Sequence, residues 1–188
     1  VGGTDATLDL REETCRTTIT DNRIKDCCEV YAGAAAIWIG QSSYNRVAHN
    51  EVLGLCQWAV SAGWTWGYMP PQNARNNVIE YNHVHDIPDS ALKTHGSIYL
   101  IGIQPMSSVN HNLIHDIGGE GSGIVLDNSA VGITVEHNLV YNVEKDCLLF
   151  NYNDIGNIIQ NNIFAMGGRS VMNRSGDSGR LDQTGVFY

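Results

Sequence analysis

The chain has 188 residues, with 11 Lys and Arg against 20 Asp and Glu, which gives a formal net charge of −9 at pH 7. Nucleic-acid binding needs a basic surface, so this balance argues against a nucleic-acid partner, and it disfavours a polyanionic substrate such as pectate. No run of 18 apolar residues occurs, so we predict neither a membrane span nor a membrane partner. The length predicts one domain, residues 1–188, that buries about 70% of its unfolded surface.

A six-residue unit recurs along the chain, with the pattern apolar, two variable residues, Asn, one variable residue, apolar. One copy is Ile79, Asn82 and Val84. The Asn residues of the copies are spaced by 28, 32, 30, 26 and 24 residues. They are Asn22, Asn50, Asn82, Asn112, Asn138 and Asn162. A period of this length predicts a solenoid.

A second short apolar run follows each copy, as in 37–39 and 98–100. Short apolar runs bounded by Gly, Asn and Asp are typical of strands, and no stretch predicts a long amphipathic helix. The sequence therefore predicts an all-β, right-handed parallel β-helix of about six coils. Its Asn column should form an inward ladder at a tight turn, because Asn tolerates left-handed backbone and its amide bonds to neighbouring backbone.

In chain order, residues 1–16 are expected to be a lead-in coil of uncertain register, and residues 175–188 to begin a further coil. The coils between them are predicted at 17–44, 45–75, 76–104, 105–129, 130–153 and 154–174. No polar capping repeat is visible, so we expect the chain to be truncated and its ends to be covered by missing coils or by another chain. We expect a secreted, cell-surface or periplasmic bacterial protein whose signal peptide is not present in the chain that begins at Val1.

The second coil carries an unusual excursion, Ser61–Pro71, that contains Trp64, Trp66 and Tyr68 among glycines. Loops that project from a rigid scaffold often carry binding residues, and large aromatic faces suit the apolar faces of sugars. We interpret these three aromatic residues as sugar-binding. The alternative is that the loop packs its own aromatic rings onto the coil.

Strand alternation places Tyr99 in one outward row of the second-strand sheet, and Asp127 and Asn151 in the next row. Glu120 precedes the same strand as Asp127. Glycoside hydrolysis needs two carboxyl groups about 5–9.5 Å apart, and neighbouring coils lie about 4.8 Å apart, so carboxylates on nearby coils can meet this requirement. The alternative is that these acids are turn residues in solvent.

Histidines and cysteines also share offsets between repeats. His85 and His115 occupy one offset, which would suit a metal ladder, but a repeated template produces the same stacking without any metal. We therefore predict exterior stacked histidines, no metal and no cofactor. Cys28 and Cys56 share another offset, which allows either a disulfide or two small buried side chains.

Several segments within residues 30–188 resemble a large family of bacterial right-handed β-helix proteins similar to glycoside hydrolase family 141. They are Ile37-Trp38-Ile39-Gly40, Gly63-Trp64-Thr65-Trp66-Gly67-Tyr68, Asn82-His83-Val84-His85-Asp86 and Gly96-Ser97-Ile98-Tyr99. The resemblance implies a pectin-lyase-like fold and activity on plant polysaccharides as a fucosidase or xylanase.

The resemblance also implies two catalytic Asp residues. One belongs to a Tyr-x-Asp-Glu segment that matches 125–128, which assigns Asp127. The other belongs to a Leu-Ser-Asp-x-Gly-Gly-Ile-Tyr segment that aligns with 92–99 and places Thr94 where the Asp stands. Thr cannot act as a carboxylate. Glu120, at the same offset one coil later, is the candidate replacement.

The leading hypothesis is a carbohydrate-active β-helix domain that binds a polysaccharide or oligosaccharide and has an impaired or altered catalytic pair. Its catalytic candidates are Asp127 and Glu120. Its substrate-binding candidates are Trp64, Trp66, Tyr68, Tyr99, Asn151, Thr94 and His95. The alternative is a non-catalytic module that binds glycan or serves structure and assembly. A polysaccharide lyase would need a cation site or an Arg or Lys base, and the sequence shows neither clearly.

Overall fold

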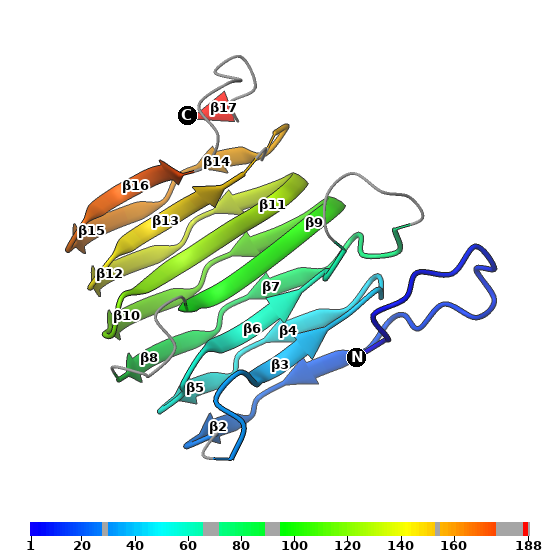
Figure 1. Cartoon of the computed structure of the whole chain (residues 1–188), viewed down its shortest axis with the longest axis horizontal. Coiled ribbons are helices and arrows are strands. Elements are labelled where there is room, and N and C mark those ends of the chain that lie inside the picture. The colour runs from blue at the N-terminus through cyan, green and yellow to red at the C-terminus, as the bar shows by residue number, and fades with distance from the viewer. Residues whose placement is uncertain (28–29, 66–71, 89–94, 153–154, 176–185, 188) are drawn as a thin grey trace.

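The computed structural model describes residues 1–27, 30–65, 72–88, 95–152, 155–175 and 186–187. Every helix or strand found within those ranges is a strand, and the strands stack in parallel as a solenoid of about five turns (Figure 1). The predicted all-β parallel β-helix is confirmed, and the number of turns is close to the six coils expected. No helix long and apolar enough to cross a membrane is found in the described part of the chain.

Each full coil contributes three strand segments, one to each face of the solenoid. The strands are β1 (Thr18–Thr20), β2 (Arg23–Lys25), β3 (Ala35–Ile39), β4 (Arg46–Ala48), β5 (Glu51–Leu53), β6 (Trp58–Ala62), β7 (Val78–Glu80), β8 (His83–Ile87), β9 (His95–Asn110), β10 (Leu113–Ile117), β11 (Gly121–Glu136), β12 (Leu139–Val143), β13 (Asp146–Asn151), β14 (Ile158–Gln160), β15 (Ile163–Gly167), β16 (Ser170–Ser175) and β17 (Val186–Phe187).

Three faces result from the way these strands pair. One is the six-stranded sheet β15-β12-β10-β8-β5-β2. The other two belong to one 11-stranded sheet, because β9 and β11 each continue from one face to the next (Figure 1). On one of these two faces β3, β6, the first half of β9, the first half of β11, β13 and β16 pair in that order, and we call this surface the groove face.

Apolar side chains of successive coils form continuous columns inside the solenoid. The predicted column is confirmed, because its members are register partners in turn. They are Ile19, Val47, Ile79, Val109, Val135 and Ile159. The four central members are fully buried, and burial of one such side chain is worth about 1.5–3 kcal/mol. Each coil therefore depends on its neighbours for most of its core.

The predicted Asn ladder is also confirmed. Both the backbone N–H and the side-chain Nδ2 of each Asn donate to the Oδ1 of the Asn one coil later, as from Asn50 to Asn82 at 3.1 and 3.0 Å. The same pairs continue from Asn22 through Asn162. The amides thus satisfy backbone groups at a corner where no strand continues.

The expected reason for Asn at the corner was only half right. None of the six ladder residues has a positive φ; the residue before each one does. His49, Tyr81, His111 and His137 occupy these positions with φ between 52 and 55°. Their rings stack along the outside at 4.7–5.1 Å. The Asn is therefore required for its hydrogen bonds and not for its backbone conformation.

A second polar ladder, which the sequence analysis missed, lies five residues before the first. Asn45 donates from its backbone N–H and its Nδ2 to Asn77 Oδ1, and Asn77 N–H donates to Ser107 Oγ. Ile133 interrupts the side-chain ladder, but its N–H donates to Asn157 Oδ1. The constant offset of five residues was the available signal.

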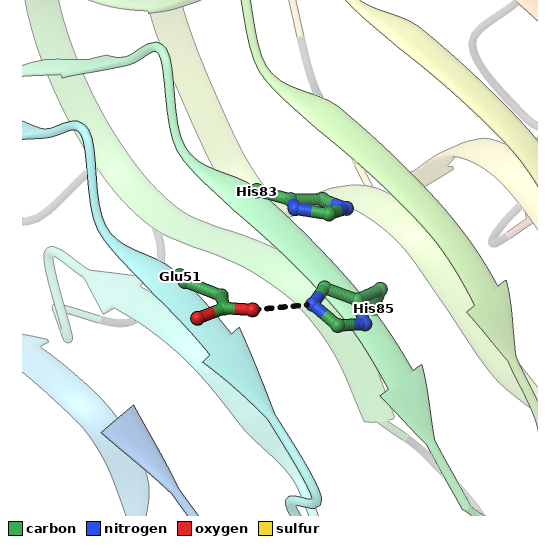
Figure 2. A group of neighbouring side chains, drawn as sticks. All are labelled: Glu51, His83 and His85. Atoms are coloured by element: carbon green, nitrogen blue, oxygen red, sulfur yellow. Dashed lines mark hydrogen bonds and ion pairs between the residues drawn. The ribbon is translucent and has the colours of Figure 1, made fainter. Parts of the chain in front are cut away.

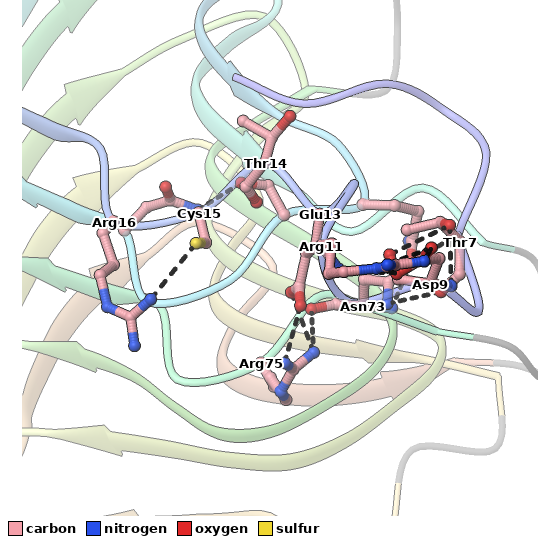
Figure 3. A network of polar contacts seen from close by, with 12 residues as sticks. Thr7, Asp9, Arg11, Glu13, Thr14, Cys15, Arg16, Asn73 and Arg75 are labelled. Carbon is pink, nitrogen blue, oxygen red and sulfur yellow. Dashed lines mark hydrogen bonds and ion pairs between the residues drawn. The ribbon is translucent and has the colours of Figure 1, made fainter.

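Residues 1–16 contain no strand, although Cys15 forms an isolated parallel bridge with Ser43 of the next coil. They form a strap that hydrogen-bonds to the coils beside it. The N-terminal amine donates to Trp38 O at 2.7 Å, and Gly40 N–H donates to Val1 O at 2.8 Å. Further along, Arg75 forms two parallel hydrogen bonds, of 3.0 and 2.9 Å, with the carboxylate of Glu13 (Figure 3). At the other end β17 pairs with β14, as a further coil would.

Candidate functional site

The groove face carries a hollow of about 470 Å³ that crosses β6, β9, β11, β13 and β16. We call it the groove. Aromatic rings line part of it, and charged and amide side chains line the rest. The lining includes Gln57, Trp58, Trp64, Tyr99, Glu120, Ser122, Val125, Asp127, Lys145, Leu149, Asn151, Arg169 and Ser175.

Asp127 is the most enclosed carboxylate of the groove, with 9% of its surface exposed. Its register partners are Ile101 of β9 and Asn151 of β13. Tyr99 Oη donates to Asp127 Oδ2 at 2.5 Å, and Asn151 Nδ2 donates to Asp127 Oδ1 at 2.7 Å. The neighbouring coils therefore orient this carboxylate from both sides, which suits a general base, a nucleophile or an acceptor of sugar hydroxyls.

The backbone just after Asp127 is unusual. Asn128 and Ser129 both have positive φ, at 42 and 70°, and the register of β11 against β9 shifts between Asp127 and Val131. Two consecutive non-Gly residues in this region cost about 1–3 kcal/mol each and persist only where the surroundings hold them. An irregularity of this kind changes the direction in which a side chain points, and here it interrupts the regular pairing of β11 with β9 directly after Asp127.

Three aromatic residues form one cluster beside Asp127. The rings of Trp58 and Tyr99 stack at 4.7 Å, and Trp64 meets Trp58 at 5.3 Å with its plane turned by 64°. The Trp64 indole N–H donates to Ser61 Oγ at 2.9 Å. Trp64 therefore both packs onto the coil and lines the groove, so the two interpretations of the aromatic loop are not exclusive at this residue.

Glu120 lies in the turn just before β11, where Lys145 Nζ approaches its Oε2 at 3.4 Å. Its side chain is 53% exposed. Glu120 precedes Asp127 by seven positions, and a strand rises about 3.3 Å per residue, so about 23 Å is the upper limit for the distance between their Cα atoms. Both carboxylates line the groove.

Two cations that the sequence analysis did not single out, Lys145 and Arg169, also line the groove. Arg169 is held by Asp146, whose carboxylate side chain is fully buried. Burial alone raises the pKa of Asp146, but hydrogen bonds from Arg169 and Ser170 outweigh it and hold that pKa below its ordinary value. Asp146 is therefore an anchor for Arg169 and not a member of the groove.

Five of the predicted site residues lie together around the groove: Trp64, Tyr99, Glu120, Asp127 and Asn151. Trp66, Tyr68 and Thr94 lie outside the described residues, as does Cys28 of the suggested disulfide. His95 begins β9 and pairs with Gly121, and its side chain is not described.

Trp58 is a groove residue that the sequence analysis missed. Alternation counted inward from Val60 places Trp58 on the core side, although it begins β6 beside the groove. Across the described ranges, one group of His, Cys, Asp or Glu has metal-ligand spacing, and it is Glu51, His83 and His85 on another face.

Comparison with known proteins places this geometry in context. A solved structure described as a glycoside hydrolase matches 84% of the chain with a TM-score of 0.71 and 26% sequence identity. The chain is a glycoside hydrolase-like β-helix. It spans 27% of the length of that hydrolase. No model of a protein family matches the sequence, and no curated protein matches it.

Proposed function

We propose that this glycoside hydrolase-like β-helix binds a polysaccharide or oligosaccharide in the groove, with Asp127 as its central polar contact. The observation that carries the proposal is the position of Asp127 beside the ring cluster of Trp58, Trp64 and Tyr99. Sugars present apolar ring faces and hydroxyl edges together, and this surface offers aromatic faces next to a hydrogen-bonding carboxylate and Asn151.

The geometry supports binding more strongly than rapid hydrolysis. A hydrolase needs its two carboxyl groups within about 5–9.5 Å. Asp127 is nearly buried, whereas Glu120 is half-exposed in the turn before β11 and already pairs with Lys145. We therefore propose weak or absent hydrolysis by this chain, with glycan binding retained. The resemblance to enzymes that act on plant polysaccharides makes those polymers the first ligands to test.

The decisive experiment is a binding screen against plant polysaccharides and their oligosaccharides, followed by calorimetric titration of the ligand that binds. Trp58→Ala should weaken that binding by tenfold or more, because it removes the ring that contacts both Tyr99 and Trp64 in the cluster. Trp38→Ala is the matched control, since Trp38 lies in β3 on the same face but does not line the groove. No binding by the wild-type chain, or equal losses in the two variants, would refute the proposal.

The same screen separates the other candidate functions. Release of reducing ends without unsaturated sugars would indicate a hydrolase, and unsaturated products would indicate a lyase that uses Lys145 or Arg169. We further propose that the protein works outside the cytoplasm, where polysaccharides are found, and cell fractionation tests that location.

A further inference from the structure

A cluster of histidines and carboxylates lies on the six-stranded sheet, away from the groove face. His83 and His85 come from β8, Glu51 from β5 and His115 from β10, so three neighbouring coils contribute. One ligand atom from each of Glu51, His83 and His85 lies within 4.8 Å of the others (Figure 2). The rings of His83 and His85 stack at 4.1 Å.

Two aspartates fix the protonation of the rings around this cluster. His85 Nδ1 lies 2.8 Å from Asp86 Oδ2, and His115 Nδ1 lies 2.7 Å from Asp116 Oδ2. A carboxylate can only accept a hydrogen bond, so each neutral imidazole carries its hydrogen on Nδ1 and has a lone pair on Nε2. Such carboxylate–histidine pairs are the usual support of metal-binding imidazoles.

The contact with His115 also determines which nitrogen of His83 carries the hydrogen. Its Nε2 lies 2.8 Å from His115 Nε2, which has the lone pair, so His83 donates from Nε2. The lone pair of neutral His83 is then on Nδ1. The network therefore provides lone pairs on both His83 and His85, next to the carboxylate of Glu51.

The contact between His85 and Glu51 also places two electron-pair donors next to each other. His85 Nε2 and Glu51 Oε1 are 3.4 Å apart, and both atoms bear lone pairs when the ring is neutral. Figure 2 marks this contact with a dashed line. Two ligands at about 2.1 Å from a tetrahedral Zn²⁺ are separated by about 3.4 Å. A cation between these atoms turns a repulsion into two bonds.

We propose that Glu51, His83 and His85 form a site for a divalent transition-metal ion, with Zn²⁺ as the preferred occupant. Two imidazoles and one carboxylate suit Zn²⁺ better than Ca²⁺ or Mg²⁺, which prefer oxygen ligands. Because its ligands come from β5 and β8, the ion links two neighbouring coils. Arg23, whose Nε lies 2.7 Å from Glu51 Oε2, competes with it for the carboxylate.

The test is calorimetric titration of the tag-free, chelator-treated chain with Zn²⁺, with Co²⁺ absorption as a second readout of imidazole ligation. We expect one saturable site per chain and a higher melting temperature with Zn²⁺. His83→Gln, His85→Gln and Glu51→Gln should each weaken binding at least tenfold. Asp86→Asn should weaken it about 10–100-fold, as loss of a supporting carboxylate does.

The matched control is His137→Gln, since His137 is an exposed histidine in the outer ring stack and outside this cluster. It should bind Zn²⁺ like the wild-type chain, and Arg23→Met should bind it more tightly. Circular dichroism of the metal-free variants establishes that each is folded. No saturable binding by the wild-type chain, or binding that survives in folded His85→Gln, would overturn the proposal.

Discussion

Replacement of Asn112 by Ala tests the Asn ladder most directly. Asn112 is 2% exposed, and its side chain makes four hydrogen bonds. Its Oδ1 accepts from the backbone N–H and the Nδ2 of Asn82, and its Nδ2 donates to Ile79 O and to Asn138 Oδ1, all at 3.0 Å. Asn82 Nδ2 keeps a second partner in Val47 O, whereas the Asn82 N–H loses its acceptor.

The expected cost follows from those partners. A buried N–H without an acceptor costs about 1–3 kcal/mol, and the space left by the amide adds about 1 kcal/mol. The free energy of unfolding should therefore fall by about 2–4 kcal/mol in Asn112→Ala, measured by urea denaturation followed by circular dichroism. Asn22→Ala is the matched control at the start of the ladder.

Asn22 is exposed, and in the described part of the chain no group donates to its Oδ1. Its replacement should cost only about 0.5–1.5 kcal/mol, because it loses bonds without leaving a buried N–H unpaired. Equal losses in the two variants would refute the reasoning, since they would mean that burial in the ladder does not set the cost.

Three further predictions concern the groove and the ion pair of Asp146 that anchors Arg169 beside it. Trp64→Ala should weaken glycan binding and also lower the melting temperature, because Trp64 packs on Trp58 and donates a hydrogen bond to Ser61. A loss of stability without any loss of glycan binding would show that Trp64 only packs. If any hydrolysis is detected, Asp127→Asn should abolish it, and Thr94→Asp should increase it; full activity of Asp127→Asn would remove Asp127 from the chemistry. Because the pKa of Asp146 is lowered, its ion pair stabilises the fold above the carboxyl's ordinary pKa of 3.8, and this stability is lost as the pH falls through the folded-state pKa. Arg169→Met should therefore reduce the loss of stability on the acid side when the free energy of unfolding is measured against pH. An unchanged pH dependence would contradict this.

The architecture was predictable because every coil of a solenoid repeats the same pattern of apolar and Asn positions. The spacing of Asn82 and its equivalents marks a corner, and the apolar residues three positions earlier mark a core column. The conformation of the corner was not predictable in the same way. The left-handed residue is occupied by His49, Tyr81 or Asn161, and side chains this different leave no compositional signal.

The groove was only partly predictable. Strand alternation found Tyr99, Asp127 and Asn151, because they lie in regular parts of β9, β11 and β13. It missed Trp58, because the first residue of β6 lies where the chain turns a corner and alternation no longer sets its direction. The hydrogen bonds of the strap formed by residues 1–16 join backbone groups and single side chains such as Glu13, and they follow no periodic pattern that the sequence could reveal.

The partners of Asp127 show how a solenoid constructs a site. Tyr99 and Asn151 are 28 and 24 residues away in sequence, which is one repeat in each direction. A groove residue is therefore oriented by the coils above and below it. The positions closest to Asp127 on this face are Ile101 and Asn151 on the adjacent coils and Val125, two residues earlier on its own strand and therefore about 6.6 Å away. None of these neighbouring side chains can ionise as an acid, and this is one reason why we propose glycan binding rather than cleavage for the groove.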